Sequence, residues 1–261
     1  MKKALLSKIP DKMPREFRRL IAASRLYDSS SSPEANVWFI DRGDGFYLKC
    51  AARGTLEKEC RMTEFFHRKG LGAEVLEYIS ADADWLLTAA VPGEDCLYEG
   101  HLAQPKRLCD TLAAALRKLH ETDHSGCPVW DRTADYLAAA EKNYRAGKYD
   151  PSFFTGNFSC RSAKEAYSLL SAGKSALQSR VLLHGDYCLP NIILKDWKLS
   201  GMIDVGCGGV GDRHIDLFWG VWTLAYNLKT DRYGERFLDA YGRDRVDVPL
   251  LQVIAAAEAF G

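Results

Sequence analysis

The segment His184-Gly-Asp-Tyr-Cys-Leu-Pro-Asn191, followed by Asp204, constrains this chain more than any other feature. It places two carboxylates and one side-chain amide at short, fixed spacings. A transferring phosphoryl group needs metal ions to neutralise its oxygens and one side chain to hold the attacking hydroxyl in line. Mg²⁺ prefers hard oxygen ligands, so Asn191 and Asp204 are candidate metal ligands. The spacing indicates phosphoryl transfer, with Asp186 orienting the acceptor hydroxyl and receiving its proton.

Short apolar runs flank this segment and give it a structural setting. Residues 180–183 and 191–194 each have the pattern of a short buried strand. A polar turn over 195–198 leads into a third apolar run, 199–203, which ends at Asp204. The pattern predicts a hairpin after the catalytic loop, with the second carboxylate delivered at its end.

The sequence resembles the aminoglycoside phosphotransferase family through His-Gly-Asp-x4-Asn and the following Ile-Asp-x-Gly. The segment Cys-Leu-Pro-Asn is especially similar to that of bacterial aminoglycoside 3'-phosphotransferases. This resemblance runs over nearly the whole chain. It implies Asp186 as the catalytic residue and Asn191 and Asp204 as magnesium ligands.

The same resemblance implies an α+β fold with the two lobes of a protein kinase. A small β-rich lobe over residues 1–91 would bind the nucleotide. A larger, mainly helical lobe over residues 92–261 would carry catalysis and substrate binding.

The amino-terminal part supplies the two residues with which a kinase-like chain holds nucleotide phosphates. Lys49 lies on an alternating, strand-like segment, 45–50, at the position of the family's lysine for the α and β phosphates. Residues 56–67 carry apolar side chains at helical spacing, and Glu59 lies beside that stripe. We expect Glu59 to pair with Lys49, with Glu57 as the alternative.

A serine run within residues 28–36 is the candidate loop over the nucleotide phosphates, because it stands between a helical pattern and a strand predicted at 37–40. It contains no glycine, and the family is similar in using a Ser/Pro loop here. Backbone N–H groups and a hydroxyl of Ser31 or Ser32 would meet the β phosphate. A serine run is otherwise typical of a mobile linker, and the pattern favours neither interpretation.

The apolar strand at 85–91 ends at a Pro-Gly pair and resembles the family's hinge in length and position. Adenine is expected there, with backbone groups of Ala89, Ala90 and Val91 making the purine hydrogen bonds. Tyr47 would stack on the ring as the family's strand aromatic does. The alternative for Tyr47 is an ordinary half-buried strand aromatic.

Several other polar residues are expected to be structural. In the family, the counterpart of His184 braces the catalytic loop by hydrogen bonding, and that of Asp216 braces the loop backbone. The alternative for Asp216 is an acid at a helix N-terminus. His120 and His124, near the end of a helix predicted over 102–122, are interpreted as capping or packing residues.

Length and composition fit a globular protein of two lobes, because 261 residues exceed one typical domain and 47% of them are hydrophobic. Thirty-five basic and thirty-five acidic residues cancel, so no global field recruits nucleic acid or an anionic membrane. No apolar run approaches a membrane span, and the eight cysteines include no Cys-x-x-Cys, which is typical of reduced cytosolic thiols. A cytoplasmic protein, monomeric or weakly dimeric, is expected.

Substrate recognition depends on carboxylates other than the catalytic one, because an aminoglycoside is a polycation. The chain ends Ala-Glu-Ala-Phe-Gly, similar to the family's acidic-aromatic terminus. Glu258 and the terminal carboxylate of Gly261 are therefore candidates for contacts with substrate ammonium groups. The alternative for Glu258 is an exposed acid on an alanine-rich helix. Asp150 is the only acidic candidate in the segment 149–156.

Three departures from the family pattern concern the substrate side. Cys207 stands where these enzymes usually carry an arginine, so a positive charge near the phosphates is lost. It lies in a glycine-rich run, 205–211, that we expect to be an irregular loop. The segment 149–156 is poor in acid, and Tyr226 and Asn227 follow a Trp-rich helix where family members place carboxylates. Regiochemistry and drug range therefore stay open.

The leading hypothesis is an aminoglycoside 3'-phosphotransferase of antibiotic resistance, which transfers phosphate from ATP or GTP with Mg²⁺ to an acceptor hydroxyl. A rival is a kinase for another small hydroxylated amine, such as choline, an amino sugar or a peptide antibiotic. A nucleotide-binding pseudokinase scaffold is the alternative from another class, and Cys207 makes it conceivable. Four intact residues count against the scaffold: Lys49, Asp186, Asn191 and Asp204.

Overall fold

The computed structural model of this chain describes residues 4–5, 13–22, 24–154 and 160–261. They belong to two compact units, the first made of Met1–Leu97 with Pro190–Gly206 and the second of Tyr98–Leu189 with Cys207–Gly261. The first unit is β-rich and the second mainly helical, which confirms the predicted α+β class. A lobe boundary after residue 91 stays a prediction.

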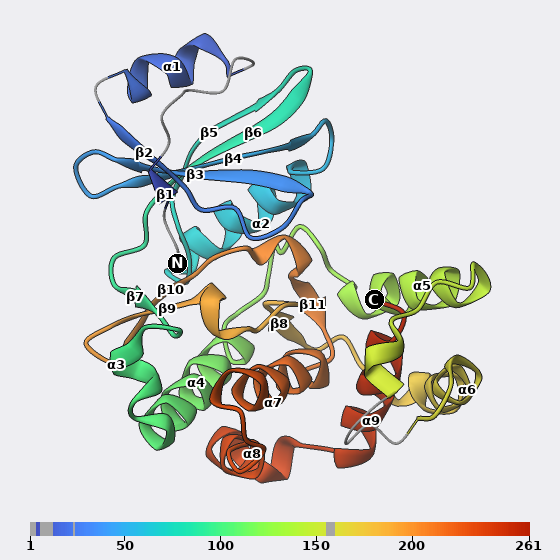
Figure 1. The fold of residues 1–261 in the computed structure, drawn as a ribbon. Coiled ribbons are helices and arrows are strands. Elements are labelled where there is room, and N and C mark those ends of the chain that lie inside the picture. Colours follow the sequence, from blue (N-terminus) through green and yellow to red (C-terminus); the bar gives the residue numbers. More distant parts are fainter. Residues whose placement is uncertain (1–3, 6–12, 23, 155–159) are drawn as a thin grey trace. The chain divides into compact units, whose positions relative to one another are not determined.

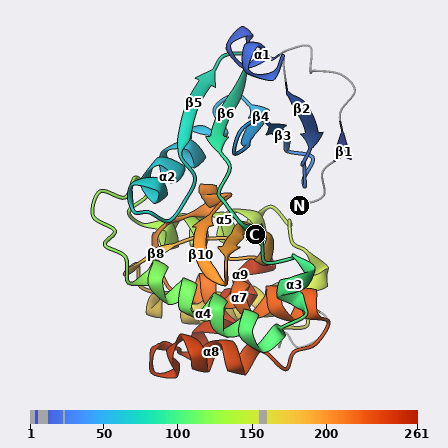
Figure 2. The ribbon, with the colours of Figure 1, turned by 90° about the vertical axis from the view of Figure 1, so that its left-hand side faces the viewer.

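A six-stranded antiparallel sheet with the order β1-β2-β3-β4-β6-β5 organises the first unit. Figure 2 shows the strands in this order across the sheet. They span Ala4–Leu5 (β1), Arg25–Asp28 (β2), Ala35–Asp41 (β3), Phe46–Ala52 (β4), Val75–Ser80 (β5) and Ala83–Ala89 (β6). Strand β4 is paired on both edges, with Lys49 between Val37 and Leu86. The strands predicted near residues 37, 45 and 85 are confirmed.

The two faces of this sheet have different partners because successive side chains of a strand point to opposite sides. Leu48 and Trp85 pack with the helix α1 (Arg15–Ile21), and Trp85 stacks on Trp38 with ring centroids 5.8 Å apart. On the other face, Leu86 packs with the helix α2 (Glu57–Arg68). Figure 1 shows the two helices on opposite sides of the sheet. Lys49 shares the face of α2, and the predicted helix over 56–67 is confirmed.

The start of α2 is fixed by a buried carboxylate from the sheet. Asp84 accepts the N–H of Leu56 at 2.9 Å and the hydroxyl of Ser80 at 2.7 Å. Such a bond satisfies a backbone donor that the first helical turn leaves without an intrahelical partner. Burial acts to raise the pKa of Asp84, but the hydrogen bonds from Ser80 and from the N–H groups of Gly54 and Leu56 outweigh it and lower the pKa to about 2.

The hairpin predicted after the catalytic loop is confirmed. It consists of β9 (Ile192–Lys195) and β10 (Lys198–Met202), and β7 (Glu94–Asp95) extends it to three strands. Its two turn residues, Asp196 and Trp197, have φ values of 51° and 62°, as in a type I′ turn. The N–H of Ile203 donates to the carbonyl of Asn191 at 3.0 Å, so Asn191 and Asp204 stand at the same end of the hairpin.

The second unit contains the remaining helices and a two-stranded sheet. The helices are α3 (Glu99–Leu102), α4 (Pro105–His120), α5 (Arg132–Arg145), α6 (Ala163–Gly173), α7 (His214–Leu228), α8 (Gly234–Gly242) and α9 (Val248–Glu258). Short 3-10 turns span Pro151–Phe154, Lys174–Ala176 and Arg243–Arg245 in this unit, and two more, Leu189–Asn191 and Val205–Cys207, lie where the chain passes from one unit to the other. The helix predicted over 102–122 is α4, which begins at Pro105 and ends at His120.

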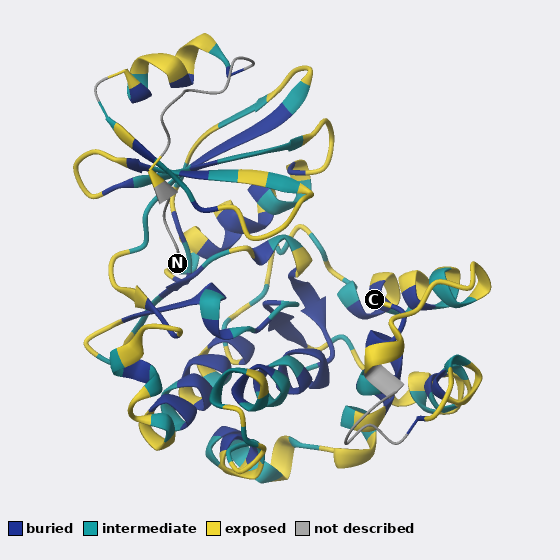
Figure 3. Cartoon of the chain, viewed as in Figure 1, coloured by how far each residue is buried: buried dark blue, intermediate teal, exposed yellow. Residues whose placement is uncertain are grey.

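The prediction of an irregular loop over 205–211 is wrong in its second half. Gly209–Gly211 forms strand β11, which pairs antiparallel with β8 (Val181–Leu183). A Cβ at Gly211 would collide with the side chain of Leu183, so glycine permits this close approach. All six residues of the two strands are buried, as Figure 3 shows.

The core of the second unit lies where α5, α6, α7 and α9 meet β8. Its buried members include Tyr136, Leu170, Ile215, Ile254 and Phe260. Among the described residues, no helix combines the length and the apolar character of a membrane span.

We expect Asp84→Ala to destabilise the protein, because it leaves the buried N–H of Leu56 without an acceptor, at a cost of about 1–3 kcal/mol. Thermal unfolding at pH 7 measures the change, with the exposed neighbour Asp82→Ala as the matched control.

The same carboxylate makes stability depend on pH. Its folded pKa of about 2 lies below the ordinary 3.8, so its contribution is full above about pH 4 and is lost as the pH falls through 2. Wild type should therefore lose stability faster than Asp84→Ala on acidification. Equal melting temperatures for the Asp84 and Asp82 variants at pH 7 would contradict this role.

Candidate active site

The first unit contains a cavity of about 490 Å³, a size typical of small-molecule sites. The face of the sheet that carries Lys49 forms one wall, and α2, the serine run, the segment after β6 and the end of the hairpin contribute further lining residues. Its predicted members are Tyr47, Lys49, Glu59, Ser31, Ala89, Val91, Asn191 and Asp204. Two predicted residues of this unit, Ser32 and Ala90, do not line it. The other four, Asp150, Asp186, Glu258 and Gly261, belong to the second unit.

Lys49 joins three elements of the first unit. Its ammonium group donates to both carboxylate oxygens of Glu59, at 2.8 and 2.9 Å, and to Asp204 Oδ1 at 3.1 Å. The expected pairing with Glu59 is confirmed. The alternative, Glu57, pairs instead with Arg61 on an exposed side of α2.

Burial and charge act against each other in this cluster. Burial acts to lower the pKa of Lys49, but the carboxylates of Asp204 and Glu59 outweigh it, so the pKa of Lys49 is raised. Burial raises the pKa of Glu59, and Lys49 offsets only part of that effect. Lys49 therefore stays an ammonium at neutral pH and presents a fixed positive charge to the cavity.

Asn191 and Asp204 provide oxygen donors at one end of the cavity. Asn191 is buried, whereas the side chain of Asp204 is 48% exposed and accessible to a ligand. The backbone of Asp204 is left-handed, with φ of 56°, a conformation that residues other than glycine adopt rarely and often at functional sites. One carboxylate and one amide are hard oxygen ligands, so this donor set fits Mg²⁺.

The serine run forms a hydrogen-bonded turn between β2 and β3, and its contact with a phosphate stays a prediction. The N–H of Ser30 donates to Asp28 at 2.9 Å, and the hydroxyl of Ser30 accepts the N–H of Val37 at 3.0 Å. Ser29 and Ser30 line the cavity together with Ser31, whereas Ser32 forms a bridge with Ala35. The first two serines were missed because their sequence context does not differ from that of the others.

Hydrogen bonds within the segment after β6 leave few backbone N–H groups there that could bind a purine. The N–H of Ala89 donates to Glu74 at 2.9 Å and that of Ala90 to Gly45 at 3.0 Å, so both are used within the unit. The N–H of Val91 makes no hydrogen bond to any described residue. Tyr47, half-buried, lies 5.1 Å from the ring of Phe39 and contributes to the wall.

Asp186 lies in the loop that follows β8 in the second unit, and two buried residues hold that loop. The carboxylate of Asp216 accepts the N–H of His184 at 2.8 Å and that of Gly185 at 2.7 Å. His184 Nδ1 accepts the N–H of Asp186 at 3.3 Å. Both predicted braces are confirmed, and the convergence of Asp186 with Asn191 and Asp204 stays a prediction.

The geometry of this loop requires glycine at position 185. Gly185 has φ of 81°, and a Cβ there would collide with the carbonyl of Cys207. The same carbonyl accepts Nε of Arg132 at 2.7 Å. A guanidinium is thus held at the loop where the sequence lacks an arginine. No sequence signal points to Arg132, because it is far away along the chain.

His120 is a packing residue, as predicted. It lies buried between Asp216, 3.2 Å from Nε2, and the hydroxyl of Tyr241, 2.8 Å from Nδ1. Burial lowers the pKa of His120, although Asp216 opposes this effect. The neutral ring contacts Oδ2 of Asp216, the same oxygen that accepts the N–H of His184.

Glu258 is buried, so the alternative of an exposed acid is wrong. Its carboxylate accepts the hydroxyl of Tyr136 at 2.8 Å and the indole N–H of Trp219. Burial raises the pKa of Glu258 to about 7, and the charge of Asp186 adds to this increase. The hydrogen bonds from Tyr136 and Trp219 and the positive charge of Arg132 act to lower the pKa. The acid therefore titrates near neutrality.

The chain terminus and Asp150 lie side by side. The N–H of Asp150 donates to the carbonyl of Ala259 at 2.9 Å, and its carboxylate accepts the N–H of Ser152 at 2.8 Å. Asn143 fixes the carbonyl of Phe260 at 2.8 Å. The predicted substrate residues Asp150, Glu258 and Gly261 are thus gathered around the end of α9, and Gly261 is exposed.

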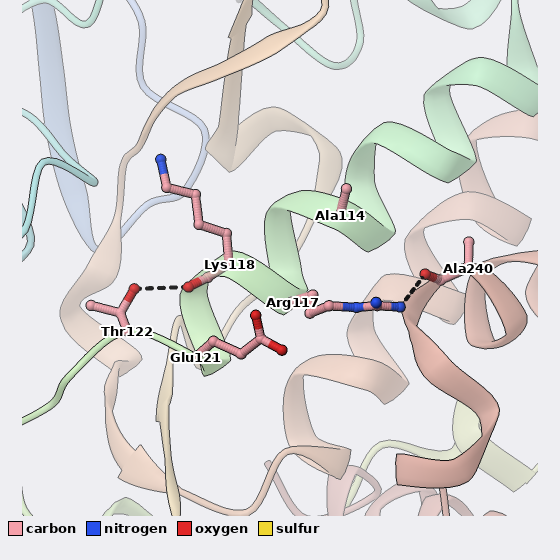
Figure 4. A pocket seen from close by; sticks show the side chains of 6 residues that line it. All are labelled: Ala114, Arg117, Lys118, Glu121, Thr122 and Ala240. Atoms are coloured by element: carbon pink, nitrogen blue, oxygen red, sulfur yellow. Dashed lines mark hydrogen bonds between the residues drawn. The ribbon is translucent and has the colours of Figure 1, made fainter.

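A second hollow, of about 480 Å³, lies between α4 and α8. Figure 4 shows Arg117 reaching across it to the carbonyl of Ala240, at 2.6 Å, and Thr122 bonded to the carbonyl of Lys118, at 2.8 Å. No predicted site residue lines it. The first bond connects α4 to α8, and the second satisfies a carbonyl in the last turn of α4. Both are structural, so we assign this hollow no part in the chemistry.

Comparison with known proteins supports phosphoryl transfer as the chemistry of this protein. The model of the phosphotransferase enzyme family matches residues 28–251. The chain belongs to the phosphotransferase enzyme family. A protein of Lactococcus lactis named "Probable aminoglycoside 3'-phosphotransferase" is 48% identical to it over 252 residues, which cover 96% of each chain.

Solved structures of this family share the fold. The crystal structure of an aminoglycoside-3'-phosphotransferase of type VIII superimposes with a TM-score of 0.79 and 25% identity, over 95% of this chain and 97% of that one. The structure of a Streptomyces rimosus aminoglycoside phosphotransferase with ADP and streptomycin gives a TM-score of 0.68 and 24% identity, over 87% and 91%. The predicted kinase-like fold and phosphotransferase class are confirmed.

We expect Glu258→Gln to flatten the pH dependence of stability between pH 4.5 and 7. The folded pKa of about 7 exceeds the ordinary 4.5, so the native state retains a proton that the unfolded chain has lost, and stability falls as the pH rises through this window. Glutamine keeps an acceptor for Tyr136 and does not titrate.

Urea unfolding at pH 5, 6, 7 and 8 tests this expectation. The exposed Glu99→Gln serves as the matched control and should follow wild type. Parallel curves for Glu258→Gln and wild type would show that burial of Glu258 does not shift its titration.

Proposed function

We propose that this protein transfers the γ-phosphoryl group of ATP to a hydroxyl of an aminoglycoside, as an aminoglycoside 3'-phosphotransferase. The observation that carries the proposal is the cluster of Lys49, Glu59 and Asp204 in a cavity of small-molecule size. The name of the Lactococcus lactis relative supports the acceptor class. The structure with ADP and streptomycin supports both ligand classes, because its fold is shared.

The nucleotide would occupy the cavity with its phosphates at Lys49. Glu59 holds the lysine ammonium in place, and the raised pKa of Lys49 keeps it charged for the α and β phosphates. The serine turn with Ser31 would meet the β phosphate. The purine would lie at Val91, whose N–H would donate to the ring, with Tyr47 stacked against it. GTP is the alternative donor.

Asn191 and Asp204 would hold Mg²⁺. When bound, the ion neutralises charge on the phosphate oxygens and aligns them for transfer. The N–H of Ile203 donates to the carbonyl of Asn191, and this bond holds both residues at the same end of the hairpin. Asp204 also contacts Lys49, so two cations would share the charge of the triphosphate.

Asp186 would hold the acceptor hydroxyl in line with the γ phosphorus. As the hydroxyl oxygen forms its bond to phosphorus, the bond to the β-phosphate oxygen breaks, ADP leaves, and the hydroxyl proton passes to Asp186. Asp216 and His184 fix the loop backbone, so the position of the carboxylate is set before substrate binds.

The acceptor's ammonium groups would contact the carboxylates around the end of α9. Asp150 and Glu258 are the proposed partners, with Gly261 beside them. Glu258 titrates near neutrality, so a bound ammonium would stabilise its charged form.

We expect Asp186→Asn to lower kcat by a factor of about 10²–10⁴, the usual contribution of a positioned general base. Nucleotide binding should be retained, because Asp186 does not line the nucleotide cavity. Acceptor-dependent ADP release with kanamycin, choline and glucosamine measures both activity and acceptor class. Asp196→Asn, in the exposed hairpin turn, is the matched control.

Wild type should turn over kanamycin and leave choline and glucosamine near background. Phosphorus NMR of the product identifies the hydroxyl that is phosphorylated. Near-normal turnover by Asp186→Asn would remove Asp186 from its role, and silence on every aminoglycoside would contradict the acceptor class.

A further inference from the structure

Helix α7 carries three aromatic side chains, Trp219, Trp222 and Tyr226, which we call the aromatic row. Spacings of three and four residues place them on one side of the helix. The ring centroids of Trp219 and Trp222 lie 5.3 Å apart, edge to face, and those of Trp222 and Tyr226 lie 4.9 Å apart, stacked at 9°. The row is therefore one continuous surface of contacting rings.

Exposure increases along the row. Trp219 and Trp222 are half-buried against the core of the second unit, whereas Tyr226 is 57% exposed. Packing of the two tryptophans against the core fixes the row, so little side-chain entropy is left to lose when a ligand binds. A rigid aromatic surface that reaches solvent is suited to ligand contact.

The inner end of the row meets a residue of the proposed acceptor site. Trp219 donates its indole N–H to the carboxylate of Glu258, whose titration responds to the charge of Asp186. The row therefore starts beside the acceptor carboxylate and runs outward to Tyr226.

The outer end of the row already holds a cation. Lys229 Nζ lies 4.3 Å from the centroid of the Tyr226 ring. An ammonium within about 6 Å of a ring face is attracted by the negative potential of the π system. The contact shows that the Tyr226 ring accepts an ammonium where solvent can reach it.

Charge complementarity selects the occupant. A polycationic amino sugar presents ammonium groups and the C–H faces of its rings, and aromatic faces attract both. An apolar ligand would gain only ring contact from this surface, whereas an ammonium also gains the cation–π attraction.

We propose that the aromatic row binds the outer sugar ring of a multi-ring aminoglycoside, and that Lys229 occupies the place which an acceptor ammonium takes on binding. The inference rests on the proposed function and adds a specificity determinant to it. The rings of Trp222 and Tyr226 would then favour acceptors that carry an additional, ammonium-bearing sugar ring over acceptors that lack this outer ring.

The first test compares kanamycin B with its two-ring fragment neamine. Tyr226→Leu should raise KM for kanamycin B about 10-fold, an effect of the size expected for a partly desolvated cation–π contact. The values of kcat, KM for ATP and KM for neamine should stay within about twofold. Trp130→Leu removes a ring that is 78% exposed and outside the row, and is the matched control.

The second test predicts a decrease in KM instead of an increase. Lys229→Gln removes the competing ammonium and should lower KM for kanamycin B about threefold. In the Tyr226→Leu background the same change should have no effect, because the two residues act through one ring. A decrease that persists in the double variant would assign the effect to general charge repulsion and overturn the role of the ring.

The two proposals fail in different ways. Absence of wild-type turnover with both acceptors would overturn the proposed function and this inference together. Normal wild-type turnover with an unchanged KM for kanamycin B in Tyr226→Leu would overturn the aromatic row alone. Neamine kinetics report whether each variant is folded and active.

Discussion

The contact of Lys49 with Glu59 and Asp204 is the interaction on which the nucleotide side of this protein depends. Each of the three residues comes from a different element, and each loses hydration when the cluster forms. Such a cluster is favourable only when its geometry is held, because removing one partner leaves an uncompensated charge. Asp84 fixes the start of α2, and Gly206 lets the hairpin end approach Glu59, since a Cβ there would lie 3.2 Å from that side chain.

In each unit a buried acid holds the backbone next to a proposed site residue. In the first unit, buried Asp84 secures the helix whose Glu59 orients Lys49. In the second, buried Asp216 binds two consecutive N–H groups of the loop that carries Asp186. The two buried acids accept backbone hydrogen bonds, so they hold the backbone beside the proposed site residues Glu59 and Asp186.

Features that depend on local spacing were predicted well. The hairpin before Asp204 and the pairing of Lys49 with Glu59 follow from short-range pattern and from the family resemblance. Features that depend on distant contacts were not: Glu258 lies in an alanine-rich helix that gives no sign of burial, and its environment comes from Tyr136 and Trp219 on other helices. Strand β11 was missed because its glycines indicate a loop until the close approach of β8 is known.

Calorimetric titration of ATP, with and without Mg²⁺, into wild type and Asp204→Asn tests the central claim most directly. If Asp204 holds the metal beside Lys49, Mg²⁺ should tighten ATP binding to wild type by about 10-fold or more, roughly 1.4 kcal/mol. Asp204→Asn should bind metal-free ATP more tightly than wild type, since a carboxylate no longer repels the phosphates, and should gain nothing from Mg²⁺. An equal gain from Mg²⁺ in both proteins would contradict the assignment.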